Sequence, residues 1–149
     1  MKAQDVMTRD LITIGPDTTL MEIAKTLLEH HISGLPVVDG DGRLLGIVSE
    51  GDLVYKEVMP KTPDAINIIH AIIHSKGVVE NYQESAEELL KLTAADIMTR
   101  KVVTVAPTEG VNRVGRIMLE HHVKRVPVIE EDRLVGIVAR ADLVKLLVK

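Results

Sequence analysis

Gly46-Ile47-Val48-Ser49-Glu50-Gly51-Asp52 is the stretch around which the chain is organised, and it returns in altered form as Gly136-Ile137-Val138-Ala139-Arg140-Ala141-Asp142. In each copy an apolar run, typical of a buried strand, leads to a small residue and, three residues later, to a carboxylate. The spacing predicts that Ser49 ends a strand and that Asp52 lies in the first turn of the next helix. A hydroxyl beside a carboxylate suits a sugar diol, because the carboxylate can accept a hydrogen bond from both sugar hydroxyls.

This motif belongs to a longer internal repeat. Asp5-Val6-Met7-Thr8-Arg9 returns as Asp96-Ile97-Met98-Thr99-Arg100, and Leu35-Pro36-Val37-Val38 returns as Val126-Pro127-Val128-Ile129. Roughly two-fifths of the aligned positions are identical, which indicates a repeated supersecondary unit. The sequence predicts one copy at 1–54 and a second at 94–149. A copy of ~50 residues buries too little apolar surface to be stable alone, so the two should share a core.

Each copy is predicted to fold as β-α-β-β-α after a short lead-in helix, which makes the fold class α/β (α+β). The lead-in helices are expected at 3–7 and 94–98, and the first strands at 11–14 and 102–105. Thr18 or Thr19 can cap the next helix, with Glu22 at the spacing of a capping box, and Thr108 is the expected cap of its counterpart. The hairpins should turn at Gly40-Asp41-Gly42 and at Glu130-Glu131-Asp132.

Residues 55–93 belong to neither copy. They are too apolar for a disordered linker, and capping residues and a stripe of isoleucines predict one or two helices packed on the repeats or on a partner subunit. His70 and His74 lie on one face of such a helix, which is a possible spacing for a metal site. No third ligand stands at an obvious spacing, so we expect a helix edge and no metal.

Composition excludes several classes of protein. The chain has 149 residues, of which 46% are hydrophobic and 27% charged, with no Cys, Phe or Trp and a formal net charge of −4. The absence of cysteine excludes disulfides and thiol chemistry, and the negative charge disfavours nucleic acid as a partner. The first residues lack the form of a secretory signal, and no apolar run approaches the ~18 residues of a membrane span. We therefore expect a cytoplasmic protein that binds no membrane.

The combination of repeated motifs resembles the cystathionine-β-synthase (CBS) domain family, whose tandem pairs are called Bateman modules. The resemblance covers about residues 3–54 and 94–146. It implies two repeats packed about a pseudo-two-fold axis, with two clefts that commonly take adenosyl ligands: AMP, ADP, ATP, S-adenosylmethionine or NAD. Such pairs usually regulate an attached or partner protein, catalyse nothing and often form homodimers.

The resemblance also assigns roles to residues. Ser49, Asp52 and Asp142 match the ribose-binding positions, although Ala139 replaces the hydroxyl residue in the second copy. The segments expected to line the base flank Thr13 and Thr104 on one side and the two Pro-Val pairs on the other. These base-lining residues are Ile12, Thr13, Ile14, Pro36, Val37, Val103, Thr104, Val105, Pro127 and Val128.

Basic residues distinguish the copies at the expected phosphate end. Lys124 and Arg125 precede Val126-Pro127, where the first copy has Ser33-Gly34, and Arg140 stands where the first copy has Glu50. With His122, these residues form the predicted phosphate site. Because phosphates in such modules lie toward the middle of the pair, Lys124 and Arg125 are expected to serve either cleft.

Three hypotheses follow. The first is a stand-alone, non-catalytic sensor of an adenine nucleotide (AMP, ADP or ATP) that forms a homodimer and acts on an unknown effector protein. The second is an interaction or scaffold protein with empty clefts, or a module for S-adenosylmethionine or NAD. The third is an enzyme, for which the sequence offers no nucleophile with a base, no metal set and no Walker-type loop.

Overall fold

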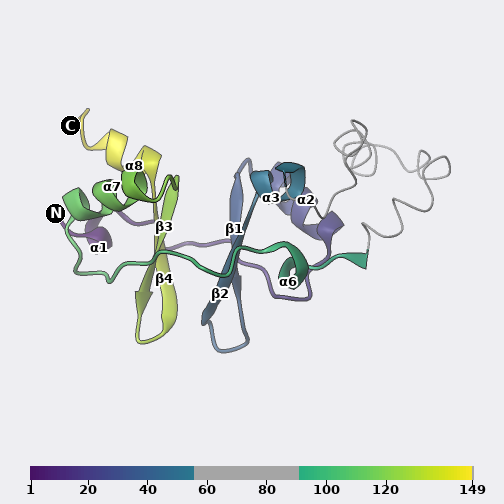
Figure 1. The fold of residues 1–149 in the computed structure, drawn as a ribbon. Coiled ribbons are helices and arrows are strands. Elements are labelled where there is room, and N and C mark those ends of the chain that lie inside the picture. The colour runs from purple at the N-terminus through teal and green to yellow at the C-terminus, as the bar shows by residue number, and fades with distance from the viewer. Residues whose placement is uncertain (56–90, 149) are drawn as a thin grey trace. The chain divides into compact units, whose positions relative to one another are not determined.

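The computed structural model describes residues 1–55 and 91–148, and the predicted helices and histidine pair of the central segment lie outside these residues. Along the described chain a short helix, a longer helix, a β-hairpin and a second short helix occur twice (Figure 1). The elements are α1 (Ala3–Val6), α2 (Leu20–Glu29), β1 (Gly34–Val38), β2 (Leu44–Ser49), α3 (Glu50–Tyr55), α6 (Ala94–Ile97), α7 (Val111–Glu120), β3 (Arg125–Glu130), β4 (Arg133–Ala139) and α8 (Arg140–Lys145). This confirms the mixed α/β class and the repeated order.

The chain forms two compact units, and these are not the two sequence copies. The second-copy unit comprises Met1–Ile12, Gly40–Leu44 and Lys101–Lys149, and the first-copy unit comprises Thr13–Asp39 and Leu45–Arg100, each as far as it is described. The lead-in segment of each copy therefore belongs to the unit that holds the hairpin of the other copy.

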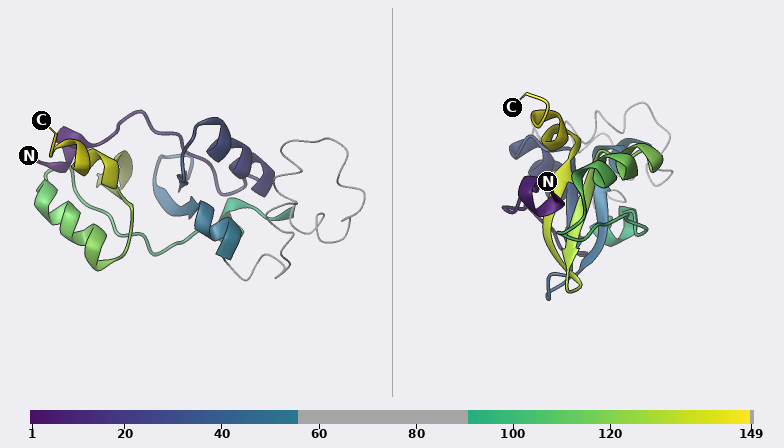
Figure 2. Two further views of the ribbon diagram at one scale, coloured as in Figure 1. Left: turned by 90° about the horizontal axis from the view of Figure 1, so that it is seen from above. Right: turned by 90° about the vertical axis from the view of Figure 1, so that its left-hand side faces the viewer.

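The exchanged segments are fixed by backbone hydrogen bonds. In the second-copy unit, Thr8 forms an antiparallel bridge with Ile137 of β4, and the views in Figures 1 and 2 place α1 beside α7 and α8. In the first-copy unit, Ile47 of β2 forms the same bridge with Thr99, just after α6. The lead-in helices form as predicted because an aspartate in the first turn accepts a hydrogen bond from the backbone N–H three residues earlier, as Asp96 does from Thr93 at 2.9 Å.

Each hairpin is a two-stranded hydrogen-bonded sheet, in which β1 pairs with β2 and β3 pairs with β4. Strands β3 and β4 pair from Arg125 with Ala139 to Glu130 with Arg133, with a bulge between Val128 and Ile129. The turn is tighter than predicted, because Glu130 belongs to the strand. Only Glu131 and Asp132 remain in the turn, and both have positive φ angles, 49° and 66°.

The long helices begin differently in the two copies. Thr19 caps α2 as predicted: Glu22 N–H donates to the Thr19 hydroxyl at 3.3 Å, and Thr19 N–H donates to the Glu22 carboxylate at 3.0 Å. The prediction that Thr108 caps α7 is wrong, because the helix starts later, with Gly110 in the cap position and no side-chain cap. Its first residue, Val111, donates its N–H to the carbonyl oxygen of Met1 at 3.1 Å instead.

The predicted first strands at 11–14 and 102–105 are absent as regular strands. Only Ile14 and Val105 form a parallel bridge each, with Val37 of β1 and Val128 of β3. The residues that follow include Pro16 and Pro107, which have no N–H to continue a ladder. The contact nevertheless lays each of these segments alongside a hairpin.

The core of the second-copy unit combines all of its segments. Ala3 from the lead-in helix is fully buried with Val114 of α7 and with Val126, Val128 and Val138 of the hairpin. Strand β3 buries three consecutive residues, Val126, Pro127 and Val128, whereas in β4 the buried residues Gly136 and Val138 alternate with partly exposed ones. Among the described residues, no helix has the length and apolar character needed to cross a membrane.

Candidate functional site

The Ser49–Asp52 motif has the geometry predicted from its spacing. Ser49 ends β2, and Asp52 lies in the first turn of α3. Ser49 N–H donates to Asp52 Oδ2 at 2.9 Å, and the Ser49 hydroxyl lies 3.3 Å from the same oxygen. Asp52 is only 8% exposed, so its carboxylate is held in place as part of the fold. Whatever ligand the motif binds, the Asp52 carboxylate also stabilises the start of α3.

The second motif repeats this geometry without the hydroxyl. Ala139 N–H donates to Asp142 Oδ2 at 2.8 Å. The other carboxylate oxygen of Asp142 lies 3.7 Å from Lys145 Nζ, one turn further along α8. The sequence analysis did not single out Lys145, although its i,i+3 spacing from Asp142 is the signal that identifies such a pair.

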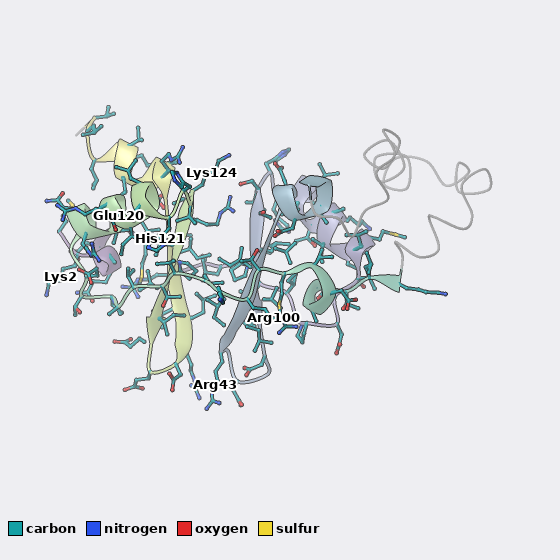
Figure 3. The ribbon with its side chains drawn as sticks, viewed as in Figure 1. Lys2, Arg43, Arg100, Glu120, His121 and Lys124 are labelled. Carbon is teal, nitrogen blue, oxygen red and sulfur yellow. The ribbon has the colours of Figure 1, made fainter. Side chains whose placement is uncertain are left out.

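Two of the predicted phosphate ligands, Lys124 and Arg140, lie near the start of α8. Arg140 N–H donates to the carbonyl oxygen of Lys124 at 2.8 Å, so the residue before β3 is joined to the residue after β4. The Lys124 and Arg140 side chains are exposed, and Arg125 is half-buried in β3. Figure 3 shows Lys124 at the start of β3, close to the helices of its unit. Two predicted phosphate ligands, Lys124 and Arg140, are therefore brought together beside the Asp142 motif.

His122 follows α7 with a φ of 54°, and His31 follows α2 with a φ of 51°. Both adopt the left-handed conformation that ends many helices, a position usually given to glycine. The preceding histidines, His30 and His121, are the C-caps, which accounts for the paired histidines structurally. His122 is exposed and lies two residues before Lys124.

The predicted base-lining residues divide into exposed and buried sets. Thr13 and Thr104 are exposed, and Ile12 and Val103 are half-buried. Ile12 is the last residue of the stretch assigned to the second-copy unit, whereas Thr13, Ile14, Pro36 and Val37 belong to the first-copy unit. The remaining members, Ile14, Pro36, Val37, Val105, Pro127 and Val128, have buried side chains that belong to the cores. These buried residues position the backbone beside the two threonines.

The buried pairs are joined by regular hydrogen bonds. Ile14 N–H donates to Pro36 O at 3.0 Å, and Val105 N–H donates to Pro127 O at 3.1 Å. The same hydrogen bond in both copies means that Thr13 and Thr104 occupy matched positions. No group of three or more His, Cys, Asp or Glu side chains that could hold a metal ion occurs in the part of the chain that the structure describes.

The profile of the CBS domain family matches residues 3–58 and 94–149, and the chain therefore belongs to the CBS domain family, with two copies in tandem. A crystal structure of the CBS domain of a membrane protein from Sphaerobacter thermophilus is 36% identical, with a TM-score of 0.75, and the alignment covers 98% of this chain and 87% of that one. These findings confirm the resemblance.

Two further relatives bear on function. The CBS domain pair of protein MJ0100, whose structure contains 5′-methylthioadenosine and S-adenosyl-L-methionine, is 29% identical, with a TM-score of 0.70 and coverage of 99% of this chain and 95% of that one. An L-aspartate semialdehyde sulfurtransferase of Methanocaldococcus jannaschii is 30% identical over 96% of this chain, which spans 22% of that enzyme.

Proposed function

We propose that the chain is a regulatory module that binds an adenine nucleotide, AMP, ADP or ATP, and acts on a partner protein without catalysing a reaction. The observation that carries the proposal is the hydrogen bond from Arg140 N–H to Lys124 O, next to the bond between Ala139 and Asp142. It brings two cationic residues and a carboxylate to one end of the second hairpin. That combination matches the two ends of a nucleotide, the ribose diol and the phosphate.

The ribose is assigned to the carboxylates. Asp142 and Asp52 are each held by a backbone N–H at 2.8 Å and 2.9 Å, which fixes the direction of the carboxylate before a ligand arrives. A pre-positioned acceptor loses little conformational entropy on binding. Because Ser49 has no counterpart at Ala139, the second motif holds the ribose with one hydroxyl fewer.

The phosphates are assigned to the cations of the second copy. Lys124 and Arg140 have exposed side chains and are joined through their backbones, and Arg140 directly follows Ala139, which donates to Asp142. Arg125 and His122 are their neighbours in sequence. A hydrogen bond to a charged group contributes about 1.5–3 kcal/mol, so two such contacts would separate a nucleotide from adenosine by ~100-fold or more.

The base is assigned to the segments around Thr13 and Thr104. Their exposed side chains stand next to Ile14 and Val105, whose backbones are fixed against the hairpins. The chain has no Phe or Trp and only two Tyr, and the residues assigned to the base are aliphatic or threonine, so the base would lie between aliphatic side chains and backbone.

The regulatory role is supported by family membership and by an apolar surface. Val144, Leu147 and Val148 at the end of the chain are 53%, 85% and 84% exposed. Exposed apolar groups of this kind often mark contacts with a partner. We propose a homodimer and a separate effector protein as the partners.

Isothermal titration calorimetry of the full chain with AMP, ADP and ATP tests the proposal. We expect binding that weakens about tenfold or more in Arg140→Glu, because a cation beside the phosphate is replaced by a carboxylate. Arg116→Glu makes the same change of charge on α7 and should leave the affinity unchanged. Absence of heat for all three nucleotides at millimolar concentration would contradict the proposal.

A module for an adenosyl thio-compound is the second candidate, supported by the ligands of the MJ0100 domain pair. In a thermal melt of the wild-type chain, S-adenosylmethionine would raise Tm and the nucleotides would not. If no adenosyl ligand raises Tm while a dimer persists in solution, a scaffold role is favoured instead.

A further inference from the structure

The two ribose motifs share their backbone geometry but differ in charge. In the first-copy unit Glu50 N–H donates to Ser33 O at 3.0 Å, and in the second-copy unit Arg140 N–H donates to Lys124 O at 2.8 Å. The same hydrogen bond thus joins a neutral and an acidic residue in one copy and two cations in the other. This hydrogen bond does not depend on the difference in charge, because in both copies it joins only backbone atoms.

The side chains at these positions are available to a ligand. Glu50, Lys124 and Arg140 are all exposed. Beside Asp52 the pair carries one negative charge, and beside Asp142 it carries two positive charges. A phosphate next to the first motif would face two carboxylates, Glu50 and Asp52, whereas next to the second motif it would face two cations.

We propose that the two copies sort adenosyl ligands by the charge of the group on the 5′ carbon, an inference that rests on the proposed function. The Asp142 motif takes a 5′-phosphorylated nucleotide. The Ser49–Asp52 motif takes an adenosyl compound with a sulfur-bound group in place of phosphate, either an uncharged thioether or a cationic sulfonium. Like charges brought together oppose binding, so the first motif disfavours a phosphate and the second disfavours a sulfonium. An uncharged thioether meets no repulsion at the second motif, but it gains nothing from the cations there and lacks the hydroxyl that Ser49 supplies at the first.

The first motif has a second property that fits an uncharged or cationic ligand. Ser49 supplies a hydroxyl 3.3 Å from Asp52 Oδ2, so hydroxyl and carboxylate are held as one polar group. A ligand without phosphate depends more on its ribose for affinity, and this motif retains the hydroxyl that Ala139 lacks. The ribose motif that has no cation at the paired positions, Ser33 and Glu50, is therefore the motif that keeps its hydroxyl.

Calorimetry of the full chain with AMP and 5′-methylthioadenosine, added separately and together, tests the sorting. Each ligand should saturate one site per chain, and neither should displace the other. Asp52→Asn should weaken methylthioadenosine about tenfold and leave AMP unchanged, and Asp142→Asn should do the reverse. S-adenosylmethionine, which carries the sulfonium, should compete with methylthioadenosine for its site and should not displace AMP.

Charge variants of exposed residues keep the test independent of the buried carboxylate. Glu50→Arg should create a second AMP site per chain, and Arg140→Glu should weaken AMP about tenfold or more while sparing methylthioadenosine. The control Asp17→Arg makes the same change as Glu50→Arg at an exposed residue of a turn and should leave one AMP site.

The outcomes separate this inference from the proposed function. If AMP binds the wild-type chain but occupies the Asp52 motif, or if methylthioadenosine displaces it, the sorting is wrong and nucleotide binding stands. If methylthioadenosine binds at Asp52 and no phosphorylated nucleotide binds anywhere, the proposed function is wrong and the assignment of the first motif stands. If neither compound binds, both are overturned.

Discussion

Thr8 and Ile137 exchange both of their backbone hydrogen bonds, at 2.9 Å and 3.0 Å, although they stand near opposite ends of the chain. Ile47 and Thr99 form the matching pair in the first-copy unit, at 3.0 Å and 2.9 Å. Each lead-in segment therefore extends the hairpin of the other sequence copy. The glycine before each isoleucine is what allows the segment to come so close.

Gly46 is expected to be intolerant of a side chain. A Cβ atom there would lie 2.7 Å from Thr99 O and 2.8 Å from Met98 Sδ, and the backbone oxygen cannot move without breaking the bridge. Gly46→Ala should lower the free energy of unfolding by about 1–3 kcal/mol, measured by urea denaturation. Gly40→Ala is the control, since a Cβ at that glycine meets nothing within 4 Å. Equal losses in the two variants would contradict the close approach.

Thr19 and Thr108 should differ in their effect on stability, although both looked like helix caps in the sequence. Thr19→Ala removes the hydroxyl that accepts from Glu22 N–H and should cost about 1 kcal/mol. Thr108→Ala should change stability by less than about 0.5 kcal/mol, because Thr108 is exposed and does not cap α7. Thermal melts of the two variants make the comparison, and a larger loss at Thr108 would refute it.

The β3–β4 turn should be open to stabilisation. Glu131 and Asp132 both have positive φ, a conformation in which Asn-Gly is favoured in two-residue hairpin turns. Replacing the pair by Asn-Gly should raise the free energy of unfolding by about 1 kcal/mol. Gly42→Ala should have the opposite sign, because its φ is 82°. The prediction fails if denaturant melts give the same sign for both changes.

Restoring the missing hydroxyl should strengthen the second motif. Ala139 N–H already donates to Asp142 at 2.8 Å, as Ser49 N–H does to Asp52 at 2.9 Å, so a serine at 139 would place its hydroxyl beside the carboxylate. Ala139→Ser should tighten nucleotide binding by about 0.5–1.5 kcal/mol, or ~2–10-fold, in calorimetry. Ser49→Ala is the reciprocal control and should leave AMP affinity unchanged if AMP occupies the second motif. An unchanged affinity in Ala139→Ser would show that the ribose does not reach this position.

Local sequence patterns predicted local geometry well. The three-residue spacing of Ser49 and Asp52 placed them at a strand end and in a helix turn, where the structure has them. The Thr19–Glu22 capping box was also recognisable, because both halves lie within one helical turn. These features are predictable because the residues that interact are only three positions apart in the sequence.

Features that depend on distant segments were not predictable in this way. Thr108 has the residue type and position of a helix cap in the sequence, but in the structure the N–H of Val111 donates to Met1 O, far earlier in the sequence. The isolated bridges of Ile14 and Val105 replaced expected strands because only one residue of each segment pairs with a hairpin. The repeat indicated two similar copies, but not that the segment before each copy would complete the other. Periodicity shows which face of an element is buried without showing which partner buries it.

The exchange of lead-in segments determines how the chain should respond to truncation and to proteolysis. A gene fragment encoding one copy would produce a protein without the strand partner for its own hairpin, and it could become complete only by borrowing that partner from another molecule. Conversely, a single cleavage between residues 55 and 91 would leave two peptides that each carry part of both units. The two peptides should copurify after cleavage, whereas two separately folded domains joined by a linker would come apart.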